Sequence, residues 1–137
     1  MGNSQNEEIA RRGLDMFSTG DTSAVSELVA DGAANHDPAQ PEEASGPEGF
    51  AQVVQMYRGM FPDLHMTVEH QFADGDYVCS RWSCEGTHEE TGKHVTVTGI
   101  SIDKIQDGKV TESWTQWDNA GMMQQLGAME PSGAATG

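Results

Sequence analysis

Basic residues are scarce in this chain. Its 137 residues include only seven lysines and arginines against 22 aspartates and glutamates, which gives a formal net charge of -15. Nucleic acids and anionic membranes would repel such a protein, so we expect neither as a partner. A surface dominated by carboxylates is typical of halophilic proteins, and it also occurs in ordinary acidic proteins of the cytoplasm.

Long apolar runs are missing as well. No segment is long enough to span a bilayer, and residues 1–8 have neither the basic start nor the apolar stretch of a signal peptide. We therefore expect a cytoplasmic protein. The length suits one domain, which we place at residues 1–127, followed by a flexible C-terminal tail at 128–137 that has nothing to bury.

Cysteine is rare, and its placement excludes a disulfide. Cys79 and Cys84 lie five residues apart in one predicted strand, which separates them by roughly 16 Å at about 3.3 Å per residue. That separation is too large for a disulfide, and the two side chains point to opposite faces of the strand. We expect both to be reduced packing residues.

Cofactor motifs are absent too. The sequence has no phosphate-binding glycine loop and no nucleophile elbow. His88 and His94 flank a predicted turn that contains Glu89 and Glu90, yet histidines beside a turn usually face solvent and no third ligand has a suitable spacing. We expect no metal and no other cofactor.

The first half of the chain is predicted to be mainly helical. Apolar spacing predicts a helix over residues 6–17, a short one through residues 25–29 capped by Thr22 or Ser23, and a third over residues 47–61. Between the last two, residues 31–45 are polar and rich in turn formers. They predict a short edge strand and a loop that could rim a pocket.

The second half has the two-residue period of strands. Strands are predicted over residues 64–72, 77–86, 95–105 and 110–118, joined by three glycine-containing hairpin turns and followed by a closing helix. Helices followed by an antiparallel meander indicate an α+β fold. In this fold the antiparallel sheet curls, the N-terminal helices cover one of its faces, and the concave face encloses a cavity.

The last strand carries the candidate chemistry. Alternation places Trp114, Gln116 and Asp118 on one face, with residues 113, 115 and 117 on the other. A carboxylate in an apolar cavity has a raised pKa, so Asp118 is a candidate general acid/base, with Trp114 as its desolvating wall. The alternative is that Asp118 caps the closing helix, and the two roles are compatible.

Several short sequence motifs carry a family resemblance. They are His36-Asp37-Pro38, Gly46-Pro47-Glu48-Gly49, Phe61-Pro62-Asp63, Gly75-Asp76, Gly86-Thr87-His88, Asp107-Gly108-Lys109-Val110, and Trp114 with Asp118 before Gln125-Leu126-Gly127. Together they resemble the SnoaL-like polyketide cyclase (ester cyclase) family. That family lies within the nuclear-transport-factor-2-like superfamily, which also holds ketosteroid isomerase, scytalone dehydratase and limonene epoxide hydrolase.

The resemblance implies a cone-shaped α+β barrel with a cofactor-free pocket, usually a homodimer through the outer face of the sheet. In the true cyclases the aspartate at the position of Asp118 is the general acid/base of an intramolecular aldol ring closure. The alignment expects a histidine where this chain has Lys104. A lysine there could stabilise an enolate as a cation.

We therefore expect a SnoaL-like protein that binds a small, largely apolar carbonyl compound, with Asp118 as a cofactor-independent acid/base. The alternatives are a non-catalytic binding module of the same fold and an enzyme similar to an epoxide hydrolase or isomerase, in which polar groups hold a water. The residues predicted to contact the ligand are Trp114, Gln116, His36, His88, Lys104 and Asn35.

Overall fold

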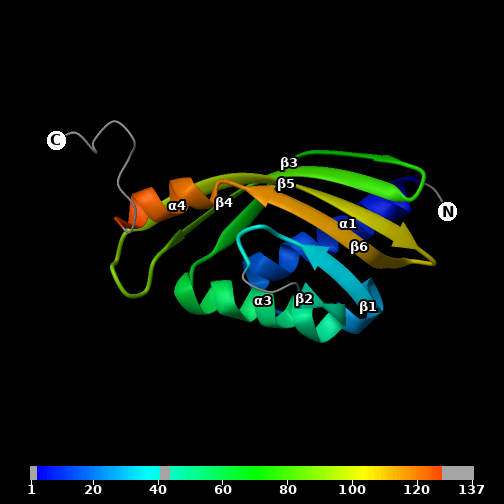
Figure 1. Ribbon diagram of the computed structural model, residues 1–137, viewed down its shortest axis with the longest axis horizontal. Coiled ribbons are helices and arrows are strands. Elements are labelled where there is room, and N and C mark those ends of the chain that lie inside the picture. Colours follow the sequence, from blue (N-terminus) through cyan, green and yellow to red (C-terminus); the bar gives the residue numbers. More distant parts are fainter. Residues whose placement is uncertain (1–2, 41–43, 128–137) are drawn as a thin grey trace.

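The structure is a computed structural model that describes residues 3–40 and 44–127, so the tail predicted at 128–137 lies outside the described residues. Four helices and six strands are described in these two ranges (Figure 1). In chain order they are α1 (Asn3–Thr19), α2 (Val25–Leu28), β1 (Val29–His36), β2 (Ala44–Ser45), α3 (Gly46–Met60), β3 (His65–Asp74), β4 (Tyr77–Thr87), β5 (His94–Gln106), β6 (Lys109–Trp117) and α4 (Asn119–Leu126).

The six strands form one curved sheet in the order β2-β1-β6-β5-β4-β3. Strands β3 to β6 are joined by three antiparallel hairpins, as their turn residues predict. Strand β1 runs parallel to β6 and lies between β6 and the two-residue strand β2, so it is not the edge strand that was predicted. The α+β fold with a curved sheet and N-terminal helices is confirmed.

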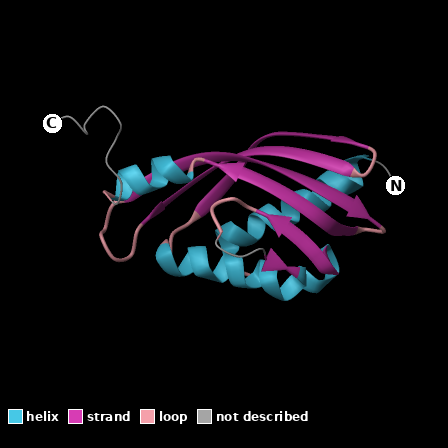
Figure 2. Ribbon diagram, viewed as in Figure 1, coloured by secondary structure: helices cyan, strands magenta, loops and turns pink. Residues whose placement is uncertain are grey.

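Helices α1 and α3 lie under the concave side of the sheet, and α4 continues from β6 at one end of it (Figures 1 and 2). Helix α3 has Pro47 in its first turn, as predicted. Helix α2 begins after Ala24, so the predicted cap at Thr22 or Ser23 is wrong. The reason is a local turn, in which the side chain of Asp21 accepts the backbone N–H of Ser23.

Two groups of buried side chains fill the space between sheet and helices. One lies around Val54, Val78 and Ile105, and the other around Phe61, Trp82 and Met122. Both cysteines are free thiols. No helix among the described residues is long and apolar enough to cross a membrane.

Candidate functional site

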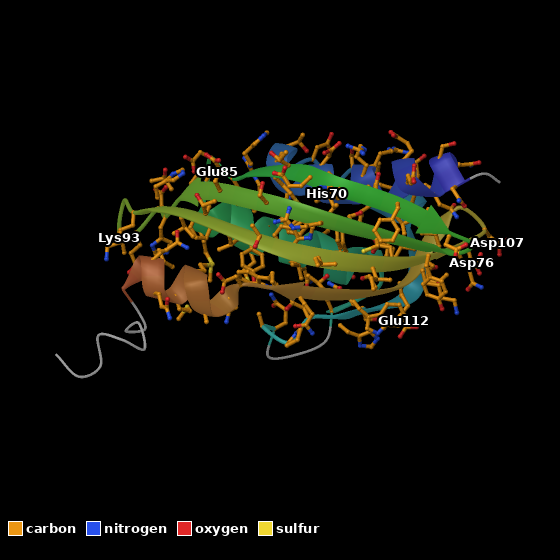
Figure 3. All side chains as sticks on the ribbon, turned by 90° about the horizontal axis from the view of Figure 1, so that it is seen from above. His70, Asp76, Glu85, Lys93, Asp107 and Glu112 are labelled. Carbon is orange, nitrogen blue, oxygen red and sulfur yellow. The ribbon has the colours of Figure 1, made fainter. Side chains whose placement is uncertain are left out.

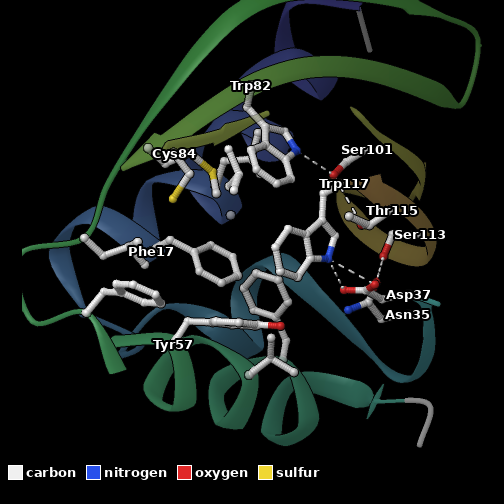
Figure 4. A pocket seen from close by; sticks show the side chains of 18 of the residues that line it. Phe17, Asn35, Asp37, Tyr57, Trp82, Cys84, Ser101, Ser113, Thr115 and Trp117 are labelled. Atoms are coloured by element: carbon white, nitrogen blue, oxygen red, sulfur yellow. Dashed lines mark hydrogen bonds between the residues drawn. The ribbon is translucent and has the colours of Figure 1, made fainter. Parts of the chain in front are cut away.

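A cavity of about 130 Å³ lies between the sheet and helices α1 and α3 (Figure 4). Its wall is mostly apolar, since aromatic and aliphatic side chains from the helices face those of β4 and β5. Polar side chains gather where β1 and β6 meet. The apolar part includes Leu14, Phe17, Phe50, Phe61, Met66, Trp82 and Val97, and the polar part includes Asn35, Asp37, Tyr57, Ser101, Asp103, Ser113 and Thr115.

The carboxylate of Asp37 follows directly after β1 and lines this cavity. It is held from two sides. The indole Nε1 of Trp117 donates to both of its oxygens, at 3.2 Å to Oδ1 and 3.1 Å to Oδ2, and the backbone N–H of Ala39 donates to Oδ1 at 2.9 Å. These donors fix the direction of the carboxylate, while Oδ2 keeps acceptor capacity for a bound molecule.

Tyr57 brings a phenol to the same end of the cavity from helix α3 (Figure 4). Burial, and then the negative charge of Asp37, raise the pKa of Tyr57 to about 12. The amide of Gln40 donates to the phenolic oxygen at 2.8 Å. The phenol therefore stays protonated at neutral pH, and its O–H is a donor that could face a developing negative charge.

A second row of polar groups crosses three strands one step away. Asn35 on β1 pairs with Ser113 on β6, which pairs with Asp103 on β5. The hydroxyl of Ser113 donates to the Asn35 side-chain oxygen at 2.9 Å. Burial alone raises the pKa of Asp103 to about 7. The site thus contains two carboxyl groups in different surroundings, Asp37 among hydrogen-bond donors and Asp103 without them.

Two tryptophans form the floor between these polar rows and the apolar wall. The indole of Trp82 donates to Ser101 Oγ at 3.0 Å, and that hydroxyl lies 3.2 Å from Thr115 Oγ1. The Trp82 ring packs over Gly99, where any Cβ would collide with that ring and with Trp117 Cβ. Only glycine fits there, so Gly99 gives the Trp82 ring room to lie against the sheet.

The thiol of Cys84 also lines the cavity. Burial, and then the neighbouring charge of Glu85, raise the pKa of Cys84 to about 12. Because the thiolate is the nucleophilic form, this cysteine is inert at neutral pH. Its part in the cavity is to pack, which agrees with the expectation from the sequence.

The sequence prediction chose the wrong face of β6. The cavity is lined by Ser113, Thr115 and Trp117, so Trp114 and Gln116 lie on the opposite, outer face. Lys104 shares that outer face, since it lies in register with Tyr77 and Glu112 and is absent from the cavity lining. None of these three predicted contact residues reaches the cavity.

Asp118 caps helix α4. Its Oδ1 accepts the backbone N–H of Gly121 at 2.9 Å, and its side chain is exposed and not part of the cavity lining. The helix-cap alternative is confirmed. A catalytic role for Asp118 stays a prediction. Its exposed carboxylate lies outside the cavity lining, so the cavity does not supply the apolar surroundings that this role assumed.

The two predicted histidines also lie outside the cavity lining. His36 Nε2 lies 2.7 Å from Glu112 Oε2, and its ring stacks on Trp114 with 5.6 Å between the ring centres. His88 contacts Phe61 from the turn after β4, and its Nδ1 lies 2.9 Å from the Thr91 hydroxyl. Of the predicted contact residues, only Asn35 lines the cavity.

The residues that the prediction missed are Asp37, Tyr57, Asp103 and Trp117. The turn at residues 107–108 would by itself place Asp103 opposite Glu112. A register shift between Lys104 and Ile105 places Asp103 opposite Ser113 instead, so the turn gave no signal for it. No signal exists for Asp37 either, since its approach to Trp117 depends on the parallel pairing of β1 with β6.

Within residues 3–40 and 44–127 no group of three or more histidine, cysteine, aspartate or glutamate side chains is arranged to hold a metal ion. The chemistry that this arrangement can perform itself is proton transfer. It offers a fixed carboxylate, a protonated phenol and a second carboxyl group around an apolar space.

Comparison with known proteins bears on the same site. The sequence profile of the SnoaL-like polyketide cyclases matches residues 7–126. The aklanonic acid methyl ester cyclase DnrD of Streptomyces peucetius is 27% identical over 138 residues, covering 91% of this chain and 92% of that protein.

Two solved structures are also similar. IdmH, a proposed polyketide cyclase from Streptomyces antibioticus, has a TM-score of 0.78 and 31% identity, covering 90% of this chain and 99% of that one. A proposed polyketide cyclase from Bacillus cereus has a TM-score of 0.80 and 30% identity, covering 92% and 83%. The likeness therefore extends over nearly all of the chain.

Proposed function

The chain belongs to the SnoaL-like polyketide cyclase family, and from that premise we propose that it catalyses an intramolecular aldol ring closure in a small, largely apolar carbonyl compound, without a cofactor. The observation that carries the proposal is the cluster of Asp37, Tyr57 and Trp117 at the polar end of an apolar cavity. An oriented carboxylate facing a protonated phenol is suited to making and holding an enolate.

In the proposed mechanism the donor carbon is a methylene between two carbonyl groups, whose C–H bond is already acidic. Asp37 Oδ2 takes the proton, and the electron pair of that C–H bond moves into the enolate. The Tyr57 hydroxyl donates to the enolate oxygen, which its raised pKa allows at neutral pH. The enolate carbon then attacks a second carbonyl of the same molecule, forming the ring bond and leaving an alkoxide that needs a proton.

The apolar wall supports this role in two ways. It selects a substrate with aromatic or aliphatic surface, and it keeps water away from the charges that develop in the reaction. The cavity lining contains no lysine, arginine or histidine among the described residues. A neutral or only weakly acidic substrate is therefore favoured over a multiply charged anion.

The proposal is tested with aklanonic acid methyl ester, the compound that appears in the name of the similar cyclase DnrD. Two reactions are followed by NMR in deuterated water: exchange of the proton on the donor methylene, and ring closure. Asp37→Asn keeps the shape of the side chain and removes the base, so both rates should fall by about 10²–10⁴-fold.

The matched comparison is Asp118→Asn, which keeps the helix cap. If Asp118→Asn loses both reactions while Asp37→Asn keeps them, the general base is Asp118 and not Asp37. Tight binding of the ester by the wild-type protein without any proton exchange would contradict the proposal and favour the non-catalytic binding module.

We also propose that the protein is a homodimer through the outer face of the sheet. On this face a stripe crosses four strands in register, from Phe72 through Cys79 and Ile102 to Trp114. Phe72 is 64% exposed and Ile102 39%, which is unusual for large apolar side chains on a free surface. Sedimentation should give a dimer that Ile102→Lys converts to a monomer, and a monomeric wild-type protein would contradict this.

A further inference from the structure

A half-buried carboxyl group, Asp103, lies near the C-terminal end of strand β5 and has no part in the steps described so far. Its side chain faces the main cavity and also a smaller one of about 40 Å³, whose other walls come from β1, β2, α3 and β6. Asn35 and Ser113 border both cavities with it. Asp103 therefore stands at the junction of the two spaces.

No hydrogen bond or ion pair joins the Asp103 carboxyl group to another residue in the described parts of the chain. Its neighbours in register, Val78 on β4 and Ser113 on β6, carry no charge. The other titratable groups that line the main cavity are Asp37, Tyr57, Cys84 and Glu85, and none of them can supply a positive charge.

These surroundings favour the protonated acid. A carboxylate without a cation or donors is costly in a low-dielectric interior, and burial raises the pKa of Asp103 to about 7. A carboxyl group that is half protonated near neutral pH can both give and take a proton, which suits a general acid. Asp37 differs from it in its surroundings, because the N–H groups of Trp117 and Ala39 donate to its carboxylate.

The positions of the two carboxyl groups fit one substrate between them. Asp103 lies two strands from Asn35, and Asp37 lies two residues beyond Asn35 along the chain. At about 4.8 Å per strand and 3.3 Å per residue their backbones are on the order of 10 Å apart. That separation is too large for the two to share a proton, and it leaves room for the reacting atoms.

We propose that Asp103 is the second catalytic acid of the site and delivers a proton to the acceptor carbonyl oxygen during ring closure. This inference rests on the proposed aldol function. As the carbon–carbon bond forms, the acceptor C=O π bond breaks, the Asp103 O–H bond breaks, and the proton moves to the new alkoxide oxygen. Asp37 ends protonated and Asp103 ionised, and exchange of one proton through water restores the starting state.

The first test separates the two halves of the reaction. In Asp103→Asn, proton exchange at the donor methylene of aklanonic acid methyl ester should continue, because Asp37 and Tyr57 are intact. Ring closure should fall by about 10²–10⁴-fold. The wild-type rate of closure should decline above about pH 7, as the acid ionises, and the variant should lose that decline. The control is Asp74→Asn, an exposed carboxylate at the end of β3.

Equal closure rates and pH profiles in wild type and Asp103→Asn would overturn the inference while leaving the role of Asp37 untouched. Absence of exchange in the wild type would instead defeat the proposed function itself, and the inference with it. These two failures are therefore distinguishable.

A second measurement needs no turnover. Infrared spectra of the wild-type protein should show the carbonyl band of a protonated carboxylic acid at pH 6, disappearing as the pH passes about 7. Persistence of this band in a folded Asp103→Asn, or its absence from the wild type at pH 6, would overturn the assignment.

Discussion

The two faces of the sheet each carry a few residues of the kind that soluble proteins usually place on the other side. The inner face carries the polar residues Ser101, Asp103 and Ser113. Ile102 and Trp114 are exposed on the outer face, which is the side from which Figure 3 views the sheet. Polar groups are expensive to bury unless something needs them, and large apolar groups are rarely left in water. The polar residues inside and the apolar residues outside agree with the two proposed roles, the inner face for a ligand and the outer face for a second copy of the chain.

The polar groups of the inner face are nevertheless largely satisfied. Trp82 donates to Ser101, Ser113 donates to Asn35, and Trp117 donates to Asp37. Among the described residues, no fully buried side-chain nitrogen or oxygen lacks a partner. The sheet can hold a polar site inside because cross-strand neighbours pair with each other, and Asp103 is the exception that keeps some accessible surface toward the cavity.

The largest expected effect compares one tryptophan from each face. Trp82 is 6% exposed and lies over Gly99, so Trp82→Ala removes a large buried ring and an indole hydrogen bond. We expect it to lower the free energy of unfolding by about 3–5 kcal/mol. Trp114 is 37% exposed and stacks on His36, so Trp114→Ala should lower it by about 1 kcal/mol or less.

Urea unfolding at low protein concentration, where a dimer contributes little, measures both values. Similar decreases in the free energy of unfolding for the two variants would contradict the difference between the faces. They would mean that the outer face belongs to the folded core as much as the inner face does.

The next effect is a dependence of stability on pH that comes from the inner face. The pKa of Asp103 is about 7 in the folded protein, against an ordinary value of 3.8. Between these values the folded protein holds a proton that the unfolded chain has released. The free energy of unfolding therefore decreases as the pH rises from about 4 to 7, by at most about 1.4 kcal/mol per pH unit, and levels off above pH 7.

Urea unfolding of wild type and Asp103→Asn at pH 5 and pH 7.5 measures this contribution. The carboxylates other than Asp103 are common to both proteins, so the difference between the two pH dependences belongs to Asp103. The wild type should lose more stability than Asp103→Asn over this interval. Parallel pH dependences would show that the Asp103 carboxyl group does not carry the proton.

Much of the fold could be predicted because it depends on local patterns. Helical spacing predicted α1 and α3, and the two-residue period with glycine turns predicted the three hairpins from β3 to β6. The location of β1 could not be obtained in this way. Its parallel pairing with β6 joins residues far apart in the sequence, and no turn sets its register.

The site was harder to predict, because alternation defines two faces without saying which one is inside. Trp114 beside a carboxylate favoured the wrong face, and the small residues Ser113 and Thr115 gave no sign of a cavity. Helices α1 and α3 pack against the face that carries Ser113 and Thr115, and this packing makes it the inner face (Figure 2). Of the predicted contact residues only Asn35 lines the cavity, and Asp37 and Asp103, which also line it, were not predicted to do so.

The smallest expected effect concerns Asp118, where β6 leaves the sheet and α4 begins. Its carboxylate accepts the N–H of Gly121, so Asp118→Ala should lower the free energy of unfolding by about 1 kcal/mol. Asp118→Asn should change it by much less, because asparagine caps a helix about as well as aspartate. Thermal unfolding of the two variants beside the wild type measures the difference.

The pair of Asp118 variants also sharpens the comparison between the faces. If Asp118 acts only as a helix cap, Asp118→Ala lowers the free energy of unfolding and Asp118→Asn leaves it nearly unchanged. Ring closure by Asp118→Asn then stays at the wild-type rate. If Asp118 is instead the general acid/base, Asp118→Asn lowers the rate of ring closure even when stability is unchanged, because an amide cannot take up and release the proton. Full stability with lost turnover in Asp118→Asn would move the chemistry out of the cavity to the end of β6, and the inner face would then serve only to bind.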